Sequence, residues 1–148
     1  MAMTLTSPSF GEGDPIPIRH TCDAEDVSPA LAWHGGPTGT AAFALVMDDP
    51  DARGWVHWVV YDIPGGTSGS LPEGVRPNDR PPQGMTSFGR TGWGGPCPPS
   101  GTHHYVFTLY ALSGAIGLSG SPTAAQVRAA AGKLTLAEAR LTGTYKRR

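Results

Sequence analysis

Two segments of this sequence carry side chains that bind anions or transfer protons. Asp49 and Asp51 precede His57 in the first segment, and His103 precedes Tyr105 in the second. Histidine rings donate hydrogen bonds and become cationic when protonated, so they suit a phosphate, sulfate or carboxylate ligand. A nearby carboxylate can accept a hydrogen bond from an imidazole, fix its tautomer and raise its pKa. The pattern therefore predicts an anion site in which Asp49 or Asp51 orients a histidine.

A loop rich in glycine and proline, residues 92–101, leads into the second histidine. Its glycines allow other groups to approach the backbone closely, whereas Pro96, Pro98 and Pro99 fix φ and remove N–H donors. Such a backbone cannot be a central strand of a sheet. We therefore expect a rigid rim beside the histidines, with glycine amides that help to hold the anion.

Three predicted strands bring these side chains together. Residues 41–47 form an apolar run that delivers Asp49, residues 55–63 are rich in aromatic and β-branched side chains, and a third strand begins at residue 103. Side chains alternate between the faces of a strand, so each histidine shares a face with an aromatic two residues away. If these faces converge on one pocket, the pocket explains why two histidines, their neighbouring aromatic residues and Asp49 all occur at strand ends. The two shared faces are Trp55, His57, Val59 and Tyr61, and His103, Tyr105, Phe107 and Leu109, with His104 pointing away.

The rest of the chain is predicted to be mostly β. We expect a short strand and a turn in residues 1–18, and a loop that leads into a short strand near Trp33. Residues 65–90 have almost no apolar period, which predicts a long surface excursion. Loops of that length in compact domains often have a function.

One helix is expected near the C-terminus. Ser121 as N-cap and Pro122 at the first helical position predict a helix that ends at Gly132. Residues 135–145 combine the capping-box spacing of a helix with the alternation of a strand, and we favour a strand.

Length, charge and cysteine content set broad limits. The 148 residues fit one domain, residues 1–148, and 11 basic against 12 acidic side chains argue against broad surfaces for nucleic acid or anionic membranes. No segment resembles a secretion signal or reaches the roughly 18 apolar residues of a membrane helix, so we expect a cytoplasmic protein without a transmembrane segment. Thiols there are usually reduced, which favours free Cys22 and Cys97 over a disulfide.

Other interpretations of the same side chains stay open. Asp49 and Asp51 lie in Asp-Pro-Asp, which is also ordinary turn chemistry, and the histidines could be core residues bonded to backbone carbonyls. Two histidines and a carboxylate could bind a metal, but the chain lacks His-x-x-x-His, His-Glu-x-x-His and Cys-x-x-Cys spacings. A hydrolase would need an activated nucleophile, and there is no Gly-x-Ser-x-Gly elbow. We therefore expect no metal, no cofactor and no enzymatic activity.

Paired motifs also support a family resemblance. The chain contains Asp49-Pro50-Asp51-Ala52 with Trp55-Val56-His57-Trp58, and later Gly95-Pro96-Cys97-Pro98-Pro99-Ser100-Gly101 with His103-His104-Tyr105-Val106-Phe107. It also contains Asp26-Val27-Ser28-Pro29 upstream and Leu141-Thr142-Gly143-Thr144-Tyr145 near the end. In this order, the motifs resemble those of the phosphatidylethanolamine-binding protein family. The match covers nearly the whole chain and is similar to the shorter bacterial and archaeal branch, the Raf kinase inhibitor-like proteins.

The resemblance implies a β-sandwich with a large antiparallel sheet, a smaller sheet and one or two short helices. It implies non-enzymatic binding of phosphate- or carboxylate-bearing ligands, such as phosphoethanolamine, in a small solvent-open pocket. Some members inhibit kinases or proteases, so a protein partner and a homodimer also fit. Arg53, where the family often has proline, and the lack of a long C-terminal helix depart from the animal branch. The expected binding residues are Asp49, Asp51, Trp55, His57, Gly95, Pro96, His103 and Tyr105.

Overall fold

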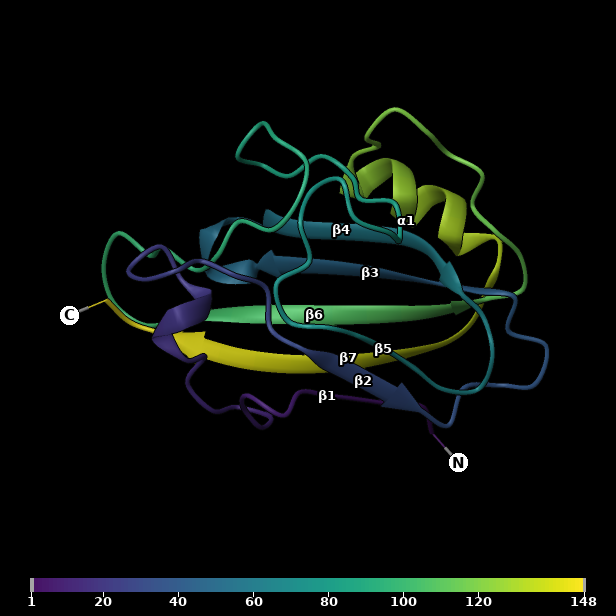
Figure 1. Ribbon diagram of the computed structural model, residues 1–148, viewed down its shortest axis with the longest axis horizontal. Coiled ribbons are helices and arrows are strands. Elements are labelled where there is room, and N and C mark those ends of the chain that lie inside the picture. Colours follow the sequence, from purple (N-terminus) through teal and green to yellow (C-terminus); the bar gives the residue numbers. More distant parts are fainter. Residues whose placement is uncertain (1, 148) are drawn as a thin grey trace.

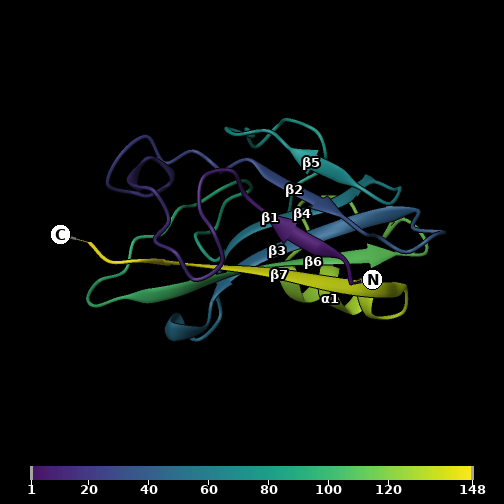
Figure 2. The same ribbon diagram turned by 90° about the horizontal axis from the view of Figure 1, so that it is seen from below.

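The computed structural model describes residues 2–147, which form two antiparallel sheets and one α-helix. The larger sheet, in the order β4-β3-β6-β7, contains β3 (Ala42–Asp49), β4 (Trp55–Pro64), β6 (His103–Leu112) and β7 (Thr135–Tyr145). The smaller sheet, in the order β1-β2-β5, contains β1 (Thr4–Thr6), β2 (Leu31–His34) and β5 (Gly69–Leu71). The smaller sheet and α1 (Ala124–Gly132) cover opposite faces of the larger sheet (Figure 1 and Figure 2). The expected mainly β fold with a large and a smaller sheet is confirmed.

Alternation along β3 builds a hydrophobic core on each face of the larger sheet. Phe43 and Leu45 pack toward the smaller sheet, where the rings of Phe43 and Trp33 lie 5.5 Å apart. Val46 points the other way and packs in the same cluster as Val127 of α1. Each of these side chains is at most 2% exposed, and burial of a side chain of this size stabilises the fold by about 1.5–3 kcal/mol. The ends of the central strands are therefore firmly fixed.

A β-bulge in β4 changes which side chains share a face. Met47 pairs with Trp58 but Asp48 pairs with Val56, so His57 is an extra residue on β4. Bulges increase the local twist and re-aim side chains, and this one directs His57 toward the face that carries Tyr105. The predicted common face is therefore wrong: Trp55 and His57 face a cavity, whereas Val59 and Tyr61 pack in the core beneath α1.

Helix α1 begins two residues later than predicted. Thr123 is its N-cap, and a capping box joins the side chains of Thr123 and Gln126 to each other's backbone N–H groups. This arrangement satisfies two donors, whereas Ser121 has a φ of 60° and belongs to the preceding turn. The predicted N-cap at Ser121 is wrong, and the end at Gly132 is confirmed. No helix within residues 2–147 is both long and apolar enough to cross a membrane.

Strand β7 confirms the strand favoured for residues 135–145. It pairs with β6 in antiparallel register and places Tyr145 opposite His103. The Thr135 hydroxyl donates to the carbonyl of Ala131 instead of capping a helix. Because β6 pairs with β3 on one side and β7 on the other, the strand that carries His103 is held from both edges.

Residues 65–90 are more deeply integrated than the predicted surface excursion. They include β5, which pairs with β2, and both Leu71 and Val75 are buried. Gln83 is buried too, and its Oε1 accepts a hydrogen bond of 2.9 Å from Nε1 of Trp58. Single buried residues between turns leave no periodic pattern in a sequence, which explains why the prediction missed them.

Candidate functional site

A cavity of about 230 Å³ opens at the end of the larger sheet where β3 ends and β6 begins. Strand β3 contributes Asp49, β4 contributes Trp55 and His57, and β6 contributes His103 and Tyr105. These five expected residues therefore lie together, as predicted from their strands. The other lining residues are Ala52, Phe88, Cys97, Pro98 and Pro99.

Asp49 serves the turn and the site at once. Its Oδ1 accepts from the backbone N–H of Asp51 at 2.8 Å and caps the short 3₁₀-helix Pro50–Ala52. Its Oδ2 accepts from Nδ1 of His103 at 2.6 Å, which forms an ion pair when the imidazole is protonated. Asp49 is only 2% exposed, so little water competes for either oxygen. The two interpretations of this carboxylate, turn cap and histidine partner, are both correct.

His57 is held by the backbone of the loop opposite. Its Nδ1 donates to the carbonyl of Gly94 at 2.6 Å, and the N–H of Gly94 donates to the carbonyl of His57 at 3.0 Å. The ring lies edge-on between Tyr105 and Phe88, with centroid distances of 5.2 and 5.3 Å. Burial lowers the pKa of His57, and its bond to the Gly94 carbonyl opposes that effect. The lowered pKa favours the neutral ring at pH 7.

Tyr105 forms the floor of the cavity and is fully buried. Burial raises the pKa of Tyr105, and the nearby charge of Asp49 raises it further. The phenol therefore keeps its proton throughout the physiological range and can donate a hydrogen bond. Its ring stacks on His103 with centroids 6.4 Å apart, so it also positions that imidazole.

Two partly exposed aromatic rings flank the entrance. Trp55 is 42% exposed, Phe88 is 37% exposed, and their rings meet edge to face with centroids 5.5 Å apart. The guanidinium of Arg90 lies 5.0 Å above the Phe88 ring. Sequence reasoning missed Phe88 because it lies in the excursion of residues 65–90. A usable signal was present, since Phe88 is the one aromatic residue in that segment.

Asp51 lies outside the lining of the cavity. Its Oδ2 accepts from both the backbone N–H and Nδ1 of His104, at 2.7 and 2.8 Å. Those hydrogen bonds lower the pKa of Asp51. Asp51 therefore connects the 3₁₀-helix after β3 to the start of β6, and the structure places this expected binding residue in a supporting position outside the cavity lining.

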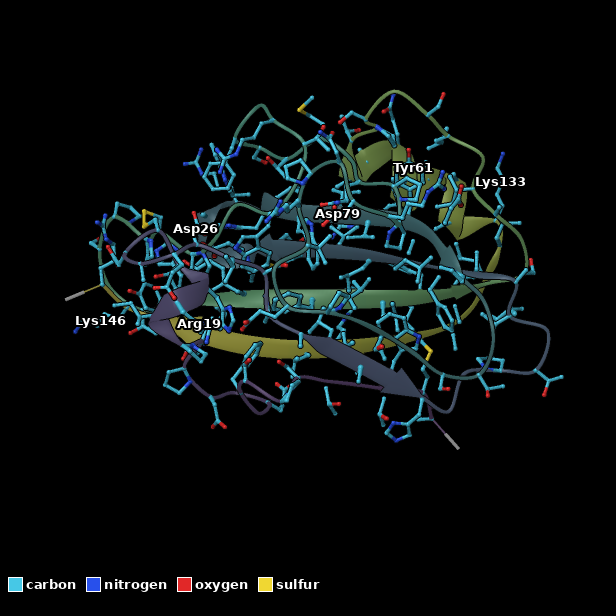
Figure 3. The ribbon with its side chains drawn as sticks, viewed as in Figure 1. Arg19, Asp26, Tyr61, Asp79, Lys133 and Lys146 are labelled. Atoms are coloured by element: carbon cyan, nitrogen blue, oxygen red, sulfur yellow. A yellow bond between two sulfur atoms is a disulfide. The ribbon has the colours of Figure 1, made fainter. Side chains whose placement is uncertain are left out.

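Gly95 and Pro96 lie behind the cavity wall and do not line it. The N–H of Gly95 donates to Oδ1 of Asp26 at 2.9 Å, and the carbonyl of Pro96 accepts from the N–H of Cys22 at 3.2 Å. A Cβ on Gly95 would lie 2.2 Å from the carbonyl oxygen of His20, so this packing requires glycine. The structure therefore places both of these expected binding residues behind the lining and does not group them with the side chains of the cavity. Asp26, a supporting residue that we had not selected, lies at the same end of the molecule (Figure 3).

Cys22 and Cys97 form a disulfide with Cα atoms 5.5 Å apart, so the expectation of two free thiols is wrong. The contacts of Asp26 and Cys22 with residues 95–96 bring together two cysteines separated by 75 positions in the sequence. Reasoning from compartment alone cannot reveal such long-range packing. Cys97 lines the cavity and Cys22 is exposed, so the disulfide ties the cavity wall to a surface loop.

The side chains around the cavity differ in what they leave available to a ligand. Within residues 2–147, no three histidine, cysteine, aspartate or glutamate side chains are grouped so that they could hold a metal ion. Both oxygens of Asp49 already accept hydrogen bonds. What the cavity offers a ligand is two imidazoles, a phenol and aromatic walls.

The chain is similar to proteins of archaea and bacteria over nearly its whole length. It is 41% identical over 150 residues to a UPF0098 protein of Methanothermobacter thermautotrophicus, covering 98% of this chain and 99% of the other. It is 44% identical over 151 residues to a candidate lipoprotein of Mycobacterium tuberculosis, LppC, covering 97% of this chain and 72% of the other. The crystal structure of CT736 from Chlamydia trachomatis, described as a candidate phosphatidylethanolamine-binding protein homologue, has a TM-score of 0.92 and 34% identity, with 99% of both chains covered.

The family follows from these matches and from the position of the paired motifs. Residues 6–146 match the sequence profile of the family described as phosphatidylethanolamine-binding protein. The two motifs lie on adjacent strand ends and meet in one cavity, as the resemblance implies. The chain belongs to the phosphatidylethanolamine-binding protein family.

Proposed function

We propose that the protein is a non-enzymatic binding protein whose cavity holds a small anion with phosphate or carboxylate oxygens. One observation carries the proposal: His57 and His103 both line the cavity, and in each ring Nδ1 is already occupied by a protein acceptor. Neither Nε2 has a protein partner, and neither is sealed from solvent. Both Nε2 atoms are therefore available to a ligand in the same space.

The size and lining of the cavity support binding rather than turnover. At about 230 Å³ it is smaller than the roughly 300–1,000 Å³ of pockets that enclose drug-sized ligands, so it suits a head group more than a lipid chain. Catalysis by nucleophilic attack needs an activated hydroxyl, thiol or carboxylate. Here the Cys97 sulfur is in a disulfide and the Asp49 oxygens are engaged. The lining thus supplies donors without a free nucleophile.

The test is anion binding by His103→Ala, with His34→Ala as the matched control. Phosphoethanolamine, inorganic phosphate and acetate serve as probes. Losing a hydrogen bond to a charged group, here the anion, costs about 1.5–3 kcal/mol, so we expect affinity to fall by about tenfold or more for His103→Ala. His34 is exposed and bonds to Thr4 in the smaller sheet, so its variant should bind normally. Equal affinities of the two variants would contradict the proposal.

A second candidate function is regulation of a kinase or another enzyme through protein contacts. The exposed rings of Trp55 and Phe88 favour it, because exposed aromatic side chains are common at protein interfaces. A pull-down with the His57/His103 double alanine variant and with Phe88→Ser separates the two functions. Capture that survives loss of both histidines and disappears with Phe88→Ser favours regulation. Capture that disappears with the double alanine variant and survives Phe88→Ser favours a function that depends on the bound anion.

The disulfide also bears on the compartment. The sequence predicts the cytoplasm, but disulfides persist mainly in oxidising compartments, and the relative LppC is named as a candidate lipoprotein. Both observations favour an oxidising compartment for this protein. Alkylation of thiols in intact cells is the test. Unmodified Cys22 and Cys97 are expected, and alkylation of both would favour the cytoplasm again.

A further inference from the structure

We propose that Asp26 is a positioning residue for the anion site, which aims the ring of His57 through the peptide unit between Gly94 and Gly95. This inference rests on the proposed function, since it concerns how the same cavity holds one of its imidazoles. Asp26 lies at the same end of the molecule as the cavity but does not line it (Figure 3). Instead it lines a different cavity of about 380 Å³, together with Trp93. Asp26 can therefore affect a bound anion only indirectly.

One peptide unit connects Asp26 to His57. Its N–H, which belongs to Gly95, donates to Oδ1 of Asp26 at 2.9 Å. Its carbonyl, which belongs to Gly94, accepts from Nδ1 of His57 at 2.6 Å. The unit is planar and trans, so its N–H and C=O point in opposite directions. Holding the N–H on Asp26 therefore directs the carbonyl at the imidazole.

The two glycines make this peptide unit dependent on hydrogen bonds for its orientation. Glycine populates both signs of φ, so a peptide plane between two glycines turns more easily than one between residues with side chains. Close packing nevertheless requires glycine at both positions. A Cβ on Gly94 would lie 2.4 Å from the Phe88 ring. A Cβ on Gly95 would lie 2.2 Å from the carbonyl oxygen of His20. The local sequence therefore does not fix the plane, and the bond to Asp26 does so.

The carboxylate of Asp26 is itself held in place. Its Oδ1 also accepts from Nε1 of Trp93 at 3.1 Å. The Trp93 ring is 8% exposed, stacks on Phe107 and meets Trp58 edge to face, with centroid distances of 6.2 and 5.4 Å. Asp26 has a φ of 58°, in the left-handed region that aspartate and asparagine enter more readily than most residues. The core thus holds the carboxylate in place, and the backbone there suits only a few residue types.

The negative charge of Asp26 acts on the same ring. Burial lowers the pKa of His57, and the charge of Asp26 is among the influences that oppose burial. The other charged or titratable groups around the ring are Asp49 at the end of β3, Tyr105 and His103 on β6, and Arg90, which lies over the Phe88 ring. Loss of the Asp26 carboxylate should therefore loosen the imidazole and lower the pKa of His57 further.

Removal of the Asp26 carboxylate tests the inference, with the same change at Asp23 as the matched control. Asp26→Gly suits the positive φ and leaves no side-chain acceptor for Gly95. Asp23→Gly alters the same loop, but the Asp23 carboxylate bonds to Tyr145 and Arg147 instead of the cavity wall. The protonated nitrogen and the pKa of His57 are followed by nitrogen NMR of the imidazoles from pH 4 to 8, without ligand.

The two glycine variants should differ at His57. In the wild type and in Asp23→Gly, Nδ1 of the neutral ring should carry the hydrogen. In Asp26→Gly the two ring nitrogens should share it, because the Gly94 carbonyl no longer stays on Nδ1, and the pKa of His57 should fall. Phosphate affinity, measured by calorimetry, should fall about threefold to tenfold in Asp26→Gly alone. An unchanged tautomer and pKa of His57 in Asp26→Gly would overturn the inference, as would an equal change in Asp23→Gly.

Asp26→Asn separates the hydrogen bond from the charge and controls for an effect on folding. The amide oxygen of asparagine can accept from Gly95, and asparagine tolerates the positive φ. We therefore expect Nδ1 of His57 to keep its hydrogen and phosphate affinity to be retained, while the pKa of His57 falls. If Asp26→Asn changes the tautomer as much as Asp26→Gly does, the bond to Gly95 does not aim the ring and the inference is wrong.

Failure of this inference can be told apart from failure of the proposed function. The NMR measurement needs no ligand, so it decides whether Asp26 aims His57 whether or not an anion binds. If the wild-type protein does not bind phosphate, phosphoethanolamine or acetate, the proposed function is wrong. If it binds them and the tautomer and pKa of His57 do not depend on Asp26, only this inference is wrong.

Discussion

The two walls of the cavity are built in different ways. Asp49, His57 and His103 lie on strands that pair along most of their length. The other wall, residues 97–102, which we call the rim, makes no hydrogen bond to the rest of the described chain. Its covalent tie is the Cys22–Cys97 disulfide. The strand wall fixes the direction of each donor, whereas the rim depends on one crosslink and on its prolines for order.

The largest effect on anion affinity is expected from substituting Asp49 on the strand wall. Asp49→Asn removes the charge that pairs with His103, so anion affinity should fall between about tenfold and a hundredfold. Asp51→Asn is the matched control, because Asp51 bonds to His104 outside the cavity and its loss should change affinity by less than about twofold. Calorimetric titration with phosphate compares the two. Similar losses in both variants would mean that Asp49 acts only through the turn.

Much of the strand wall was predictable from the sequence, and so was the position of the glycine- and proline-rich loop beside the histidines. The disulfide of the rim and the position of Phe88 at the entrance were not. Alternation gave the positions of Asp49, His103 and Tyr105, because a regular strand has a fixed period. The same rule wrongly placed Val59 and Tyr61 on the face of His57, since nothing in the local pattern marks the extra residue of a bulge. Phe88 and the disulfide depend on contacts between segments far apart in the chain, which local patterns do not contain.

Removing the disulfide that holds the rim should lower the stability of the fold more than it lowers the affinity for anions. A disulfide that joins residues 75 positions apart restricts the unfolded chain, and its loss should lower the free energy of unfolding by about 4 kcal/mol. Anion affinity should fall only several-fold, because the donors on the strands stay in place. Denaturant unfolding and phosphate titration of the Cys22→Ser/Cys97→Ser double variant check both values. A loss of affinity as large as that of Asp49→Asn would show that the rim orients the donors too.

The buried His57 should make stability depend on pH. Its pKa is lowered in the folded state, so between that value and the unfolded value of about 6.5 the unfolded chain binds more protons. The contribution of His57 is therefore complete above about pH 6.5 and is lost as pH falls, by at most about 1.4 kcal/mol per pH unit. Measuring the free energy of unfolding of wild type and His57→Phe from pH 7 to 5 isolates the contribution of His57. A wild-type curve parallel to that of the variant would contradict it.

The smallest effect on phosphate affinity is expected from substituting Phe88 at the entrance of the cavity. Phe88→Ala removes one edge-to-face contact with His57 and one with Trp55, so phosphate affinity should fall about twofold to threefold. Leu118→Ala is the control for general loss of packing, because Leu118 is partly buried against the cluster that contains Val127 of α1 and does not line the cavity. If Phe88→Ala lowers affinity by more than Asp49→Asn, the entrance rather than the strand wall determines binding.

The most direct test of the account follows the five histidines by NMR while phosphate is added. The account predicts that the imidazole signals of His57 and His103 shift together and saturate at one ligand concentration. The signals of His20, His34 and His104, which do not line the cavity, should stay in place. If His57 and His103 do not respond, or if they saturate at different concentrations, the two histidines do not share an anion site and the central claim is wrong.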